Sequence, residues 1–461
     1  MCLARVAEPI ASFLPTVHFS PFPSRARRRP GEGETFHLSP STLCSALLLC
    51  LTPAALLADT HTWTGGAGGG NYLATTPANW GGTAPETNDD IVLNATSSSN
   101  MTWNMTNMTV ASWTQAGYTG TVTIATVYGT TGFTNFSIGG DCIISNGVWT
   151  QTVNPVSTVE GARLRVTIGG NLIVGLNGSI NVTGTGAYQG PGAGLGSSYG
   201  GQGSYNGVPH PCYGSLVAPT NLGSRGDSDS GGGAIWITVA GEIANDGLVC
   251  ADGFGSYRAG AGGSIWLIGG TMRGSGTIRA NGGTVNAAGG GRIALVVTNA
   301  DADFTFYTGA IRCLGGGGAA CCGTIYLRTA AQGPNAGTLI VDNENGAYNP
   351  YTQINSYVTD TAVGDVIIRN NGRLLIDTNQ TLTVNGNWSN SATFVARTGS
   401  GVILGGAAGS TAILYGKTSF MNLVCTNGDK TLVFPNGLTN TVMAGGGLTL
   451  RGVETASNLY L

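Results

Sequence analysis

A glycine-aliphatic pattern recurs about every thirty residues in the middle of this chain, and it constrains the fold more than any other feature. Between Gly139 and Leu327 the sequence reads GGDCII, GGNLIV, GGAIWI, GGSIWL, GGRIAL and CGTIYL. The first apolar positions of the copies form a column: Cys142, Leu172, Ile235, Ile265, Ile293 and Ile325. The column is evenly spaced except between Leu172 and Ile235, where the step is twice as long. Such a period is typical of repeat proteins, in which each unit buries its apolar side against its neighbours.

Each unit contains more than one strand. After GGSIWLIG the chain continues with TMRG and GTIRANGG, so glycine turns separate three short apolar segments. The third segments align at Val249, Ile278 and Ile311. The alternation of a strand then places three neighbouring side chains outward: Cys250, Arg279 and Arg312. The sequence therefore predicts an all-β fold, a right-handed parallel β-helix with three short strands per rung of about 30 residues.

We expect four parts along the chain. Residues 1–58 are a leader with a signal peptide, and residues 59–135 are an N-terminal β cap module. Residues 136–346 form the parallel β-helix, which a glycine-rich insertion at 185–231 interrupts within the long step of the column. Residues 347–461 are irregular β repeats that we expect to be incomplete, because their last strand-like unit has no polar cap.

The leader indicates export. Four arginines between Arg25 and Arg29 precede an apolar stretch from Leu43 to Leu57, the order of a secretory signal peptide. No later apolar stretch reaches the 18 or so residues needed to cross a bilayer, so we expect no transmembrane span in the mature chain. The predicted location is extracellular or at a bacterial cell surface.

Composition excludes several classes of protein. Charged residues make up 9% of the chain and the net charge is −3, which argues against charge-driven disorder. The 77 glycines do not follow the three-residue period of collagen. After the leader, Lys417 and Lys430 are the lysines of the chain, and no basic stripe is present. We therefore expect no nucleic-acid partner.

The cysteines and histidines do not suggest a metal site or a cofactor. Seven cysteines follow the leader, without paired CxxC spacing, and the whole chain has four histidines. Cys142 and Cys313 fall in apolar columns, where cysteine acts as a small apolar side chain. The alternative is a disulfide from Cys212 to Cys250 or to the Cys321/Cys322 pair.

Two outward-facing groups are candidates for binding. The column next to the aliphatic one reads Ile143, Ile173, Trp236, Trp266, Ala294 and Tyr326. Stacked Trp236 and Trp266 would form a flat aromatic surface suited to sugar rings, and Tyr326 in the same column is a further candidate for glycan binding. The alternative is that the tyrosine-rich insertion covers this face. Arg279 and Arg312 form a second group, at a spacing that could bind an acidic polymer.

The opening HTWTGGAGGGNY…ANWGGTAPETNDDIVLN resembles bacterial autotransporter-associated β-strand-repeat and related surface proteins. The middle, GGSIWLIGGTMRGSGTIRANGG…GGGRIALVV, is similar to glycine-rich β-solenoid repeats of large secreted bacterial proteins. The resemblance spans most of the chain after the leader, and it implies export and surface display. It implies no particular activity.

These observations favour an exported structural or adhesive β-solenoid surface protein without catalytic activity. Extracellular polysaccharide or cell-surface components are the expected partners. A polysaccharide-binding or polysaccharide-cleaving β-helix of the pectate-lyase type is the alternative. Cleavage would need a paired acid and base, and Asp252, beside Arg279, has no aligned carboxylate partner. We therefore assign no catalytic residue.

Overall fold

The computed structural model describes residues 58–255, 257–285, 287–346 and 350–452, all of which belong to one compact unit. The predicted signal peptide lies outside these residues. The described chain consists of strands, turns and one 3-10 helix, η1 (Pro77–Trp80), so the all-β prediction is confirmed. Among the described residues, no helix has the length and apolar character needed to cross a membrane.

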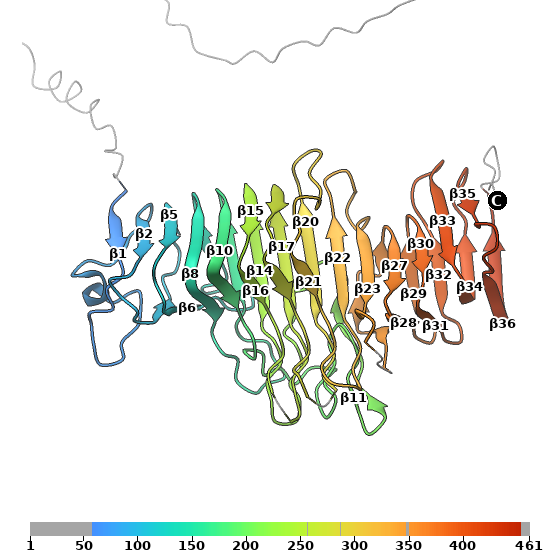
Figure 1. The fold of residues 1–461 in the computed structure, drawn as a ribbon, viewed down its shortest axis with the longest axis horizontal. Helices are drawn as coiled ribbons and strands as arrows, with labels where there is room; N and C mark the ends of the chain where they lie inside the picture. Colours follow the sequence, from blue (N-terminus) through green and yellow to red (C-terminus); the bar gives the residue numbers. More distant parts are fainter. Residues whose placement is uncertain (1–57, 256, 286, 347–349, 453–461) are drawn as a thin grey trace, which may run out of the picture. The chain divides into compact units, whose positions relative to one another are not determined.

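Most strands belong to two 12-stranded sheets that share one apolar core over the N-terminal half (Figure 1). The first sheet contains β1 (Thr60–Thr62), β2 (Asp90–Leu93), β3 (Met101–Trp103), β5 (Ser112–Gln115), β6 (Thr121–Ile124), β8 (Cys142–Gln151), β10 (Leu172–Asn181), β15 (Glu242–Asn245), β16 (Leu248–Cys250), β18 (Thr271–Arg273), β19 (Thr277–Arg279) and β21 (Ala310–Arg312). The second sheet contains β4 (Thr109–Val110), β7 (Phe136–Ile138), β9 (Leu164–Ile168), β14 (Ala234–Val239), β17 (Ser264–Gly269), β20 (Arg292–Val297), β22 (Thr324–Arg328), β23 (Thr338–Asp342), β27 (Val366–Arg369), β30 (Trp388–Asn390), β33 (Thr411–Gly416) and β35 (Thr431–Val433).

Three smaller groups of strands complete the described chain. A third sheet contains β24 (Thr352–Ile354), β28 (Arg373–Ile376) and β31 (Thr393–Ala396). A fourth contains β26 (Ala362–Val363), β29 (Thr381–Val384), β32 (Gly401–Leu404), β34 (Ser419–Cys425) and β36 (Thr441–Leu450). The insertion contributes the hairpin β11 (Ser204–Tyr205) and β12 (Val208–Pro209), and β13 (Gly214–Ser215), which pairs with β25 (Val358–Thr359).

Parallel pairing in the N-terminal half joins positions that are one repeat apart in the sequence. One pass of the chain, here called a layer, gives one strand to the second sheet and two segments to the first, as the three-strand prediction requires. The predicted third segments do pair in register, at Val249, Ile278 and Ile311. The column Ile235, Ile265, Ile293 and Ile325 is also confirmed. Strands from residues 59–135 join the same two sheets.

The alignment of the first two glycine-aliphatic copies with the other four is wrong. Cys142 and Leu172 lie in the first sheet, where Leu172 pairs with Ile243. In the second sheet, Ile235 pairs with Leu164 on the side of the preceding layer. The pattern misleads because a glycine followed by aliphatic residues begins strands in both sheets. Since Leu164 pairs directly with Ile235, the insertion adds more chain to this layer than an ordinary layer contains.

A ladder of glycines explains why the repeat begins as it does. A Cβ on Gly263 would collide with the carbonyl oxygen of Gly233, and one on Gly291 with that of Gly263. A Cβ on Gly323 would likewise collide with the carbonyl oxygen of Gly291. The backbones of successive layers approach closely at this corner, so any side chain would force them apart.

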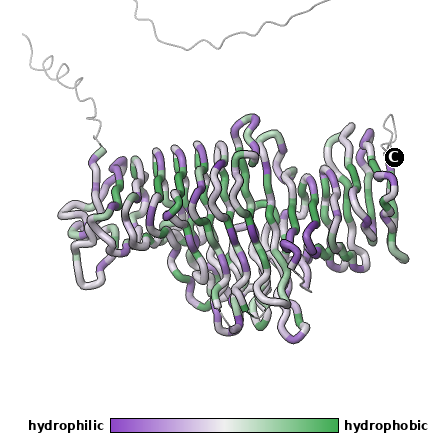
Figure 2. Tube along the Cα trace, viewed as in Figure 1, coloured by the Kyte–Doolittle hydropathy of each residue, from purple (hydrophilic) through white to green (hydrophobic). Residues whose placement is uncertain are grey.

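The second sheet buries different faces in its two halves. Inward side chains such as Ile293 and Ile325 belong to the N-terminal core, whereas Tyr326 and Leu339 belong to the C-terminal core. The change occurs where β22 and β23 pair antiparallel, the one antiparallel step among the described strands of this sheet. Apolar residues recur along the strands on both sides of that step (Figure 2). The N-terminal core and the C-terminal core therefore pack against opposite faces of the second sheet.

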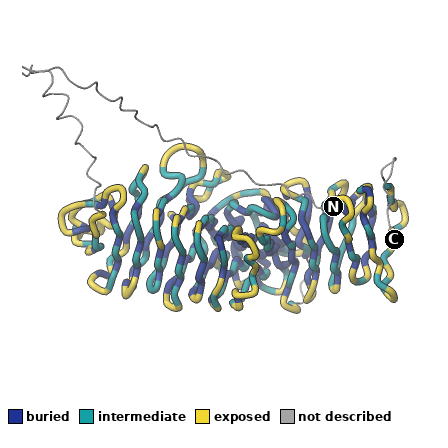
Figure 3. The backbone as a smooth tube through the Cα atoms, turned by 90° about the horizontal axis from the view of Figure 1, so that it is seen from above, coloured by how far each residue is buried: buried dark blue, intermediate teal, exposed yellow. Residues whose placement is uncertain are grey.

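The insertion lies against the second sheet on the face opposite the N-terminal core. The hydroxyl groups of Tyr199 and Ser264 form a 2.6 Å hydrogen bond. The Arg292 Nε donates to the carbonyl oxygen of Tyr213 at 2.9 Å. Seen from above, buried residues are concentrated around these central layers, while exposed residues follow the loops (Figure 3). The insertion is thus a packed cover over part of the sheet.

Candidate functional site

The predicted aromatic strip lies on the outer face of the second sheet, but its composition differs from the prediction. Ile143 and Ile173 belong to the first sheet, because the first two repeat copies were misaligned. Paired register instead gives the outer column Arg165, Trp236, Trp266, Ala294 and Tyr326. An arginine therefore stands where the sequence predicted an aliphatic residue.

The two tryptophans do stack. Their ring centroids are 4.7 Å apart and the ring planes are inclined by 20°. The guanidinium carbon of Arg165 lies 3.9 Å from the centroid of Trp236 on the neighbouring strand. A cation placed over an indole face is attracted by the ring quadrupole. Trp236 is therefore held between Arg165 and Trp266, and both indoles are partly buried.

The rest of the strip is covered. Ala294 is 0% exposed and Tyr326 is 1% exposed, and both share a buried cluster with Leu216 of the insertion. The small side chain of Ala294 lets this segment approach the sheet closely. The alternative that the insertion covers the aromatic face is thus confirmed at Ala294 and Tyr326. The stacked pair of Trp236 and Trp266 is confirmed, whereas Tyr326 does not extend it as an exposed surface.

A buried carboxyl group fastens the insertion to the neighbouring loop. Glu160 accepts hydrogen bonds from the backbone N of Leu222 at 2.6 Å and from the Asn221 amide at 3.1 Å. Burial raises the pKa of Glu160 to about 7, although these two hydrogen bonds and the Arg163 charge oppose the shift. Removing water from the charged form makes deprotonation costly. The attachment therefore contains a group that titrates near neutral pH.

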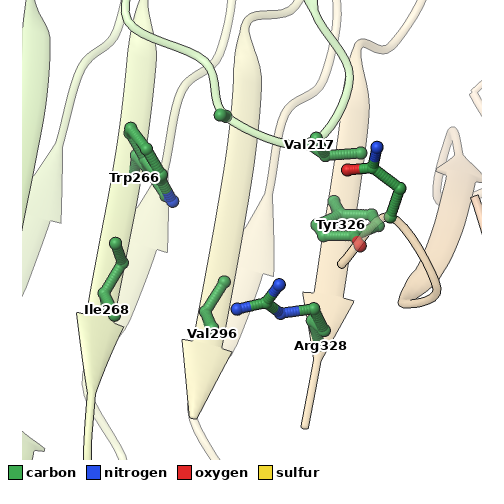
Figure 4. Close-up of a pocket in the computed structure, with 8 residues that line it drawn as sticks. Val217, Trp266, Ile268, Val296, Tyr326 and Arg328 are labelled. Atoms are coloured by element: carbon green, nitrogen blue, oxygen red, sulfur yellow. The ribbon is translucent and has the colours of Figure 1, made fainter. Parts of the chain in front are cut away.

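A pocket opens beside Val217 and Ala218 of the insertion, next to the covered strip (Figure 4). It has a volume of about 200 Å³. Its lining residues come from three consecutive strands of the second sheet, from the insertion and from the loop after β22: Val217, Ala218, Trp266, Ile268, Val296, Tyr326, Arg328 and Asn335. Most of these side chains are apolar or aromatic, and the polar groups are few. That is the usual composition of a small-molecule binding site.

Two N–H donors of this pocket have no acceptor among the described residues. They are the indole Nε1 of Trp266 and the Nε of Arg328, and both atoms are buried. Figure 4 shows the Arg328 guanidinium extending toward Val296, with Trp266 on the strand beyond. The Tyr326 hydroxyl already accepts a 2.9 Å hydrogen bond from the backbone N of Gly337. A buried donor without a partner is costly, so the pocket suits a ligand that brings acceptors.

The predicted arginine pair does not contribute to this pocket. Arg279 and Arg312 are adjacent on the first sheet, in the register that the sequence predicted. Each forms an ion pair within the chain. Arg279 Nε lies 2.9 Å from Asp252 Oδ2, and Arg312 Nε lies 2.7 Å from Glu344 Oε1. Their charges are therefore neutralised locally. The structure brings Trp266 and Tyr326 together, with Trp236 beside them, and leaves the two arginines on another sheet.

Sequence reasoning missed Arg328 and Asn335. Arg328 lies two residues after Tyr326 on one strand, so simple alternation puts both on the same face. Arg328 would have been found if the outward-facing positions of each strand had been followed two residues beyond the aromatic column. Asn335 and Val217 come from loops, where the pattern of apolar residues has no period. They could not be placed from the sequence.

The described cysteines are free and buried, so the predicted disulfide alternative is wrong. The Cys321 and Cys322 sulfurs are 3.9 Å apart, and burial raises the pKa of Cys313 to about 12. Thiols held protonated in this way are poor nucleophiles. No group of three or more metal-ligating side chains was found in the part of the chain that the structure describes.

Comparison with known proteins gives no family assignment. No protein-family model matches the chain, and no curated protein or solved structure is significantly similar to it.

Proposed function

We propose that this chain is an exported, non-catalytic surface protein that binds saccharide through the pocket beside Trp266. Its body is a right-handed parallel β-helix, and its role is structural or adhesive. The single observation that carries the binding proposal is the pocket itself. It combines apolar walls with the unpartnered donors of Trp266 and Arg328.

The long parallel sheets support the structural part of the proposal. Strands one layer apart pair throughout the N-terminal half, and the glycine ladder permits close stacking. Each layer contacts its immediate neighbours, as in repeat proteins that present extended binding surfaces. The resemblance of the opening and middle segments to bacterial surface proteins also favours such a role.

The outer face supports the saccharide part. Sugar rings present apolar C–H faces to aromatic side chains and hydroxyl groups to polar ones, and the pocket offers partners for both. The volume of about 200 Å³ is smaller than the roughly 300–1,000 Å³ of pockets for drug-sized ligands. One sugar unit of a longer chain fits this description better than several units do.

Retention on polysaccharide tests the binding proposal. We expect affinity electrophoresis through gels containing single polysaccharides to retard the chain in at least one of them. Replacing Trp236 and Trp266 together by alanine should abolish the retardation, because it removes the partly exposed stacked pair, of which Trp266 lines the pocket. Phe306→Ala is the matched control, since this aromatic residue is 77% exposed and does not line the pocket. Unchanged retardation of the double variant would refute the proposal.

Release of reducing sugar tests the non-catalytic part. The alternative of a polysaccharide-cleaving enzyme predicts new reducing ends, or unsaturated products, on incubation with the polysaccharide that is retained. We expect neither. Either product, lost in Asp252→Asn, would instead favour the enzyme, because Asp252 is the carboxylate beside Arg279.

Fractionation tests export. Expressed with its own leader in a bacterium, the chain should be recovered outside the cytoplasm and begin close to Ala58. An intact leader on a cytoplasmic product would contradict the proposed location.

A further inference from the structure

We infer that the pocket recognises a carboxylate-bearing sugar, a uronic acid unit of an acidic polysaccharide, and that Arg328 selects it. The inference rests on the proposed saccharide binding and makes it more specific. It depends on the charge of the pocket, on the direction of its hydrogen bonds and on the shape of its walls.

The pocket carries a positive charge that the described residues do not neutralise. Six other described arginines form ion pairs with carboxylates, and these are Arg258, Arg273, Arg279, Arg312, Arg369 and Arg397. No such pair includes Arg328 in the described chain, and no acidic residue lines the pocket. A partly buried guanidinium without a counter-charge is costly, and a ligand anion would offset that cost.

The polar groups of the pocket are mainly donors. Arg328 and Trp266 line the pocket, and the Nε of Arg328 and the Nε1 of Trp266 are buried without acceptors among the described residues. The Tyr326 hydroxyl is already an acceptor for Gly337. A neutral sugar hydroxyl can satisfy one such donor, whereas a carboxylate offers two oxygens with several lone pairs. The fork of an arginine side chain matches the two oxygens of a carboxylate in one plane.

The walls fit the remainder of a sugar ring. Val296 and Ile268 are on adjacent strands and face outward in register with Arg328. They form an apolar floor beside the guanidinium, and Trp266 stands at one side (Figure 4). Val217 and Ala218 of the insertion limit the other side. A small inorganic anion would leave these apolar surfaces unused, so the walls favour an anion attached to a ring.

Titration calorimetry with the full chain tests the inference. The probes are trigalacturonate, the same oligosaccharide with its carboxyl groups reduced to alcohols, and a sulfated neutral oligosaccharide. We expect trigalacturonate to bind at least about 10-fold more tightly than the reduced form, because a hydrogen bond to a charged group contributes this much or more. Added salt should weaken trigalacturonate binding and leave binding of the reduced form unchanged.

Variants locate the effect. Arg328→Gln should lower affinity for trigalacturonate by about 10- to 100-fold and leave the reduced oligosaccharide unaffected. Trp266→Phe keeps an aromatic wall but removes the N–H, and should lower affinity for both probes by less. Arg273→Gln is the matched control, since this arginine is paired with Glu242 on the first sheet. Circular dichroism checks that each variant is folded.

The possible failures are distinguishable. Equal affinity for trigalacturonate and its reduced form would overturn the inference and leave the proposed saccharide binding standing. Preference for the sulfated probe would also overturn it, as would an acid preference that survives in Arg328→Gln. Absence of binding to all three probes and to every polysaccharide in the gels would refute the proposed function itself.

Discussion

The N-terminal and C-terminal halves of this chain use the same sheet but bury opposite faces of it. In the N-terminal half, the side carrying Ile293 and Ile325 is buried. In the C-terminal half the layers are shorter, since Leu339 pairs with Val366 and, in the third sheet, Arg373 with Thr393. There the side carrying Leu339 is buried instead. The outer face of one half is thus continuous with the core of the other.

The difference explains the position of the pocket. Trp266, Tyr326 and Trp388 lie on one face of the second sheet, yet their surroundings change from partly open to fully buried along it. The insertion covers the face up to Tyr326, and the C-terminal core begins at Leu339. The pocket lies at this transition, where neither cover is complete. A binding site at such a junction needs no change in the repeat itself.

The largest expected effect tests whether the shared face really changes character. Trp388 is 0% exposed, and its indole nitrogen donates to the Thr418 hydroxyl at 3.0 Å. Trp388→Ala should therefore lower the free energy of unfolding by about 3–5 kcal/mol. Trp266→Ala, on the same face but partly open, should lower it by about 1–2 kcal/mol. Urea unfolding followed by circular dichroism measures both, and equal losses would contradict the comparison.

The glycine ladder should matter nearly as much within the N-terminal half. Gly291→Ala forces a Cβ against the carbonyl oxygen of Gly263, so we expect a loss of about 1–3 kcal/mol. A Cβ on Gly318 would meet no atom within 4 Å. Gly318→Ala is therefore the control and should leave the unfolding midpoint unchanged. Hydrogen exchange of amides in β17 and β20 would show whether the loss is local.

The covered face should also respond to pH, through Glu160. Burial raises the pKa of Glu160 from its ordinary 4.5 to about 7, so the folded state binds this proton more tightly than the unfolded chain. Stability should consequently fall as pH rises between about 4.5 and 7, by up to about 1.4 kcal/mol per pH unit. Hydrogen exchange at Leu222 monitors the attachment. Glu160→Gln keeps an acceptor and should remove the dependence; a slope that persists would exclude Glu160 as its source.

The smallest effects should be the same in both halves. Arg312 pairs with Glu344 at 2.7 Å, and Arg369 pairs with Asp342 at 2.6 Å. Arg312→Gln and Arg369→Gln should each cost about 0–1 kcal/mol, since exposed ion pairs stabilise little. Thermal unfolding at low and high salt should show these losses shrinking as salt is added. A larger cost for Arg312 alone would reveal a role for it that the ion pair does not explain.

The fold was more predictable than the site, for a physical reason. Periodic burial leaves a periodic sequence, so the register of Ile235, Ile265 and Ile293 could be inferred from spacing alone. Cys142 and Leu172 were misplaced because two walls of the same structure begin with the same glycine-aliphatic signal. A repeat therefore predicts the number and spacing of layers more surely than it predicts which of the two sheets a given strand joins.

The site depends on features that have no period. Val217 and Asn335 reach the pocket from connecting segments, and the burial of Tyr326 depends on how the insertion lies over Ala294. The ion pairs of Arg279 with Asp252 and of Arg312 with Glu344 also depend on single neighbouring residues and not on the repeat. Stacking of the two tryptophans and a cover by the insertion were both predictable, whereas the layers at which the cover begins and ends were not.

The antiparallel step between β22 and β23 has a consequence for how such proteins are assembled. The strand direction reverses there, and the buried side of the sheet changes at the same point. The second sheet therefore continues from one core to the other without a free edge between them. The hairpin between Arg328 and Thr338 is accordingly a natural splice point, at which one coil could be exchanged for another to make a chimaera.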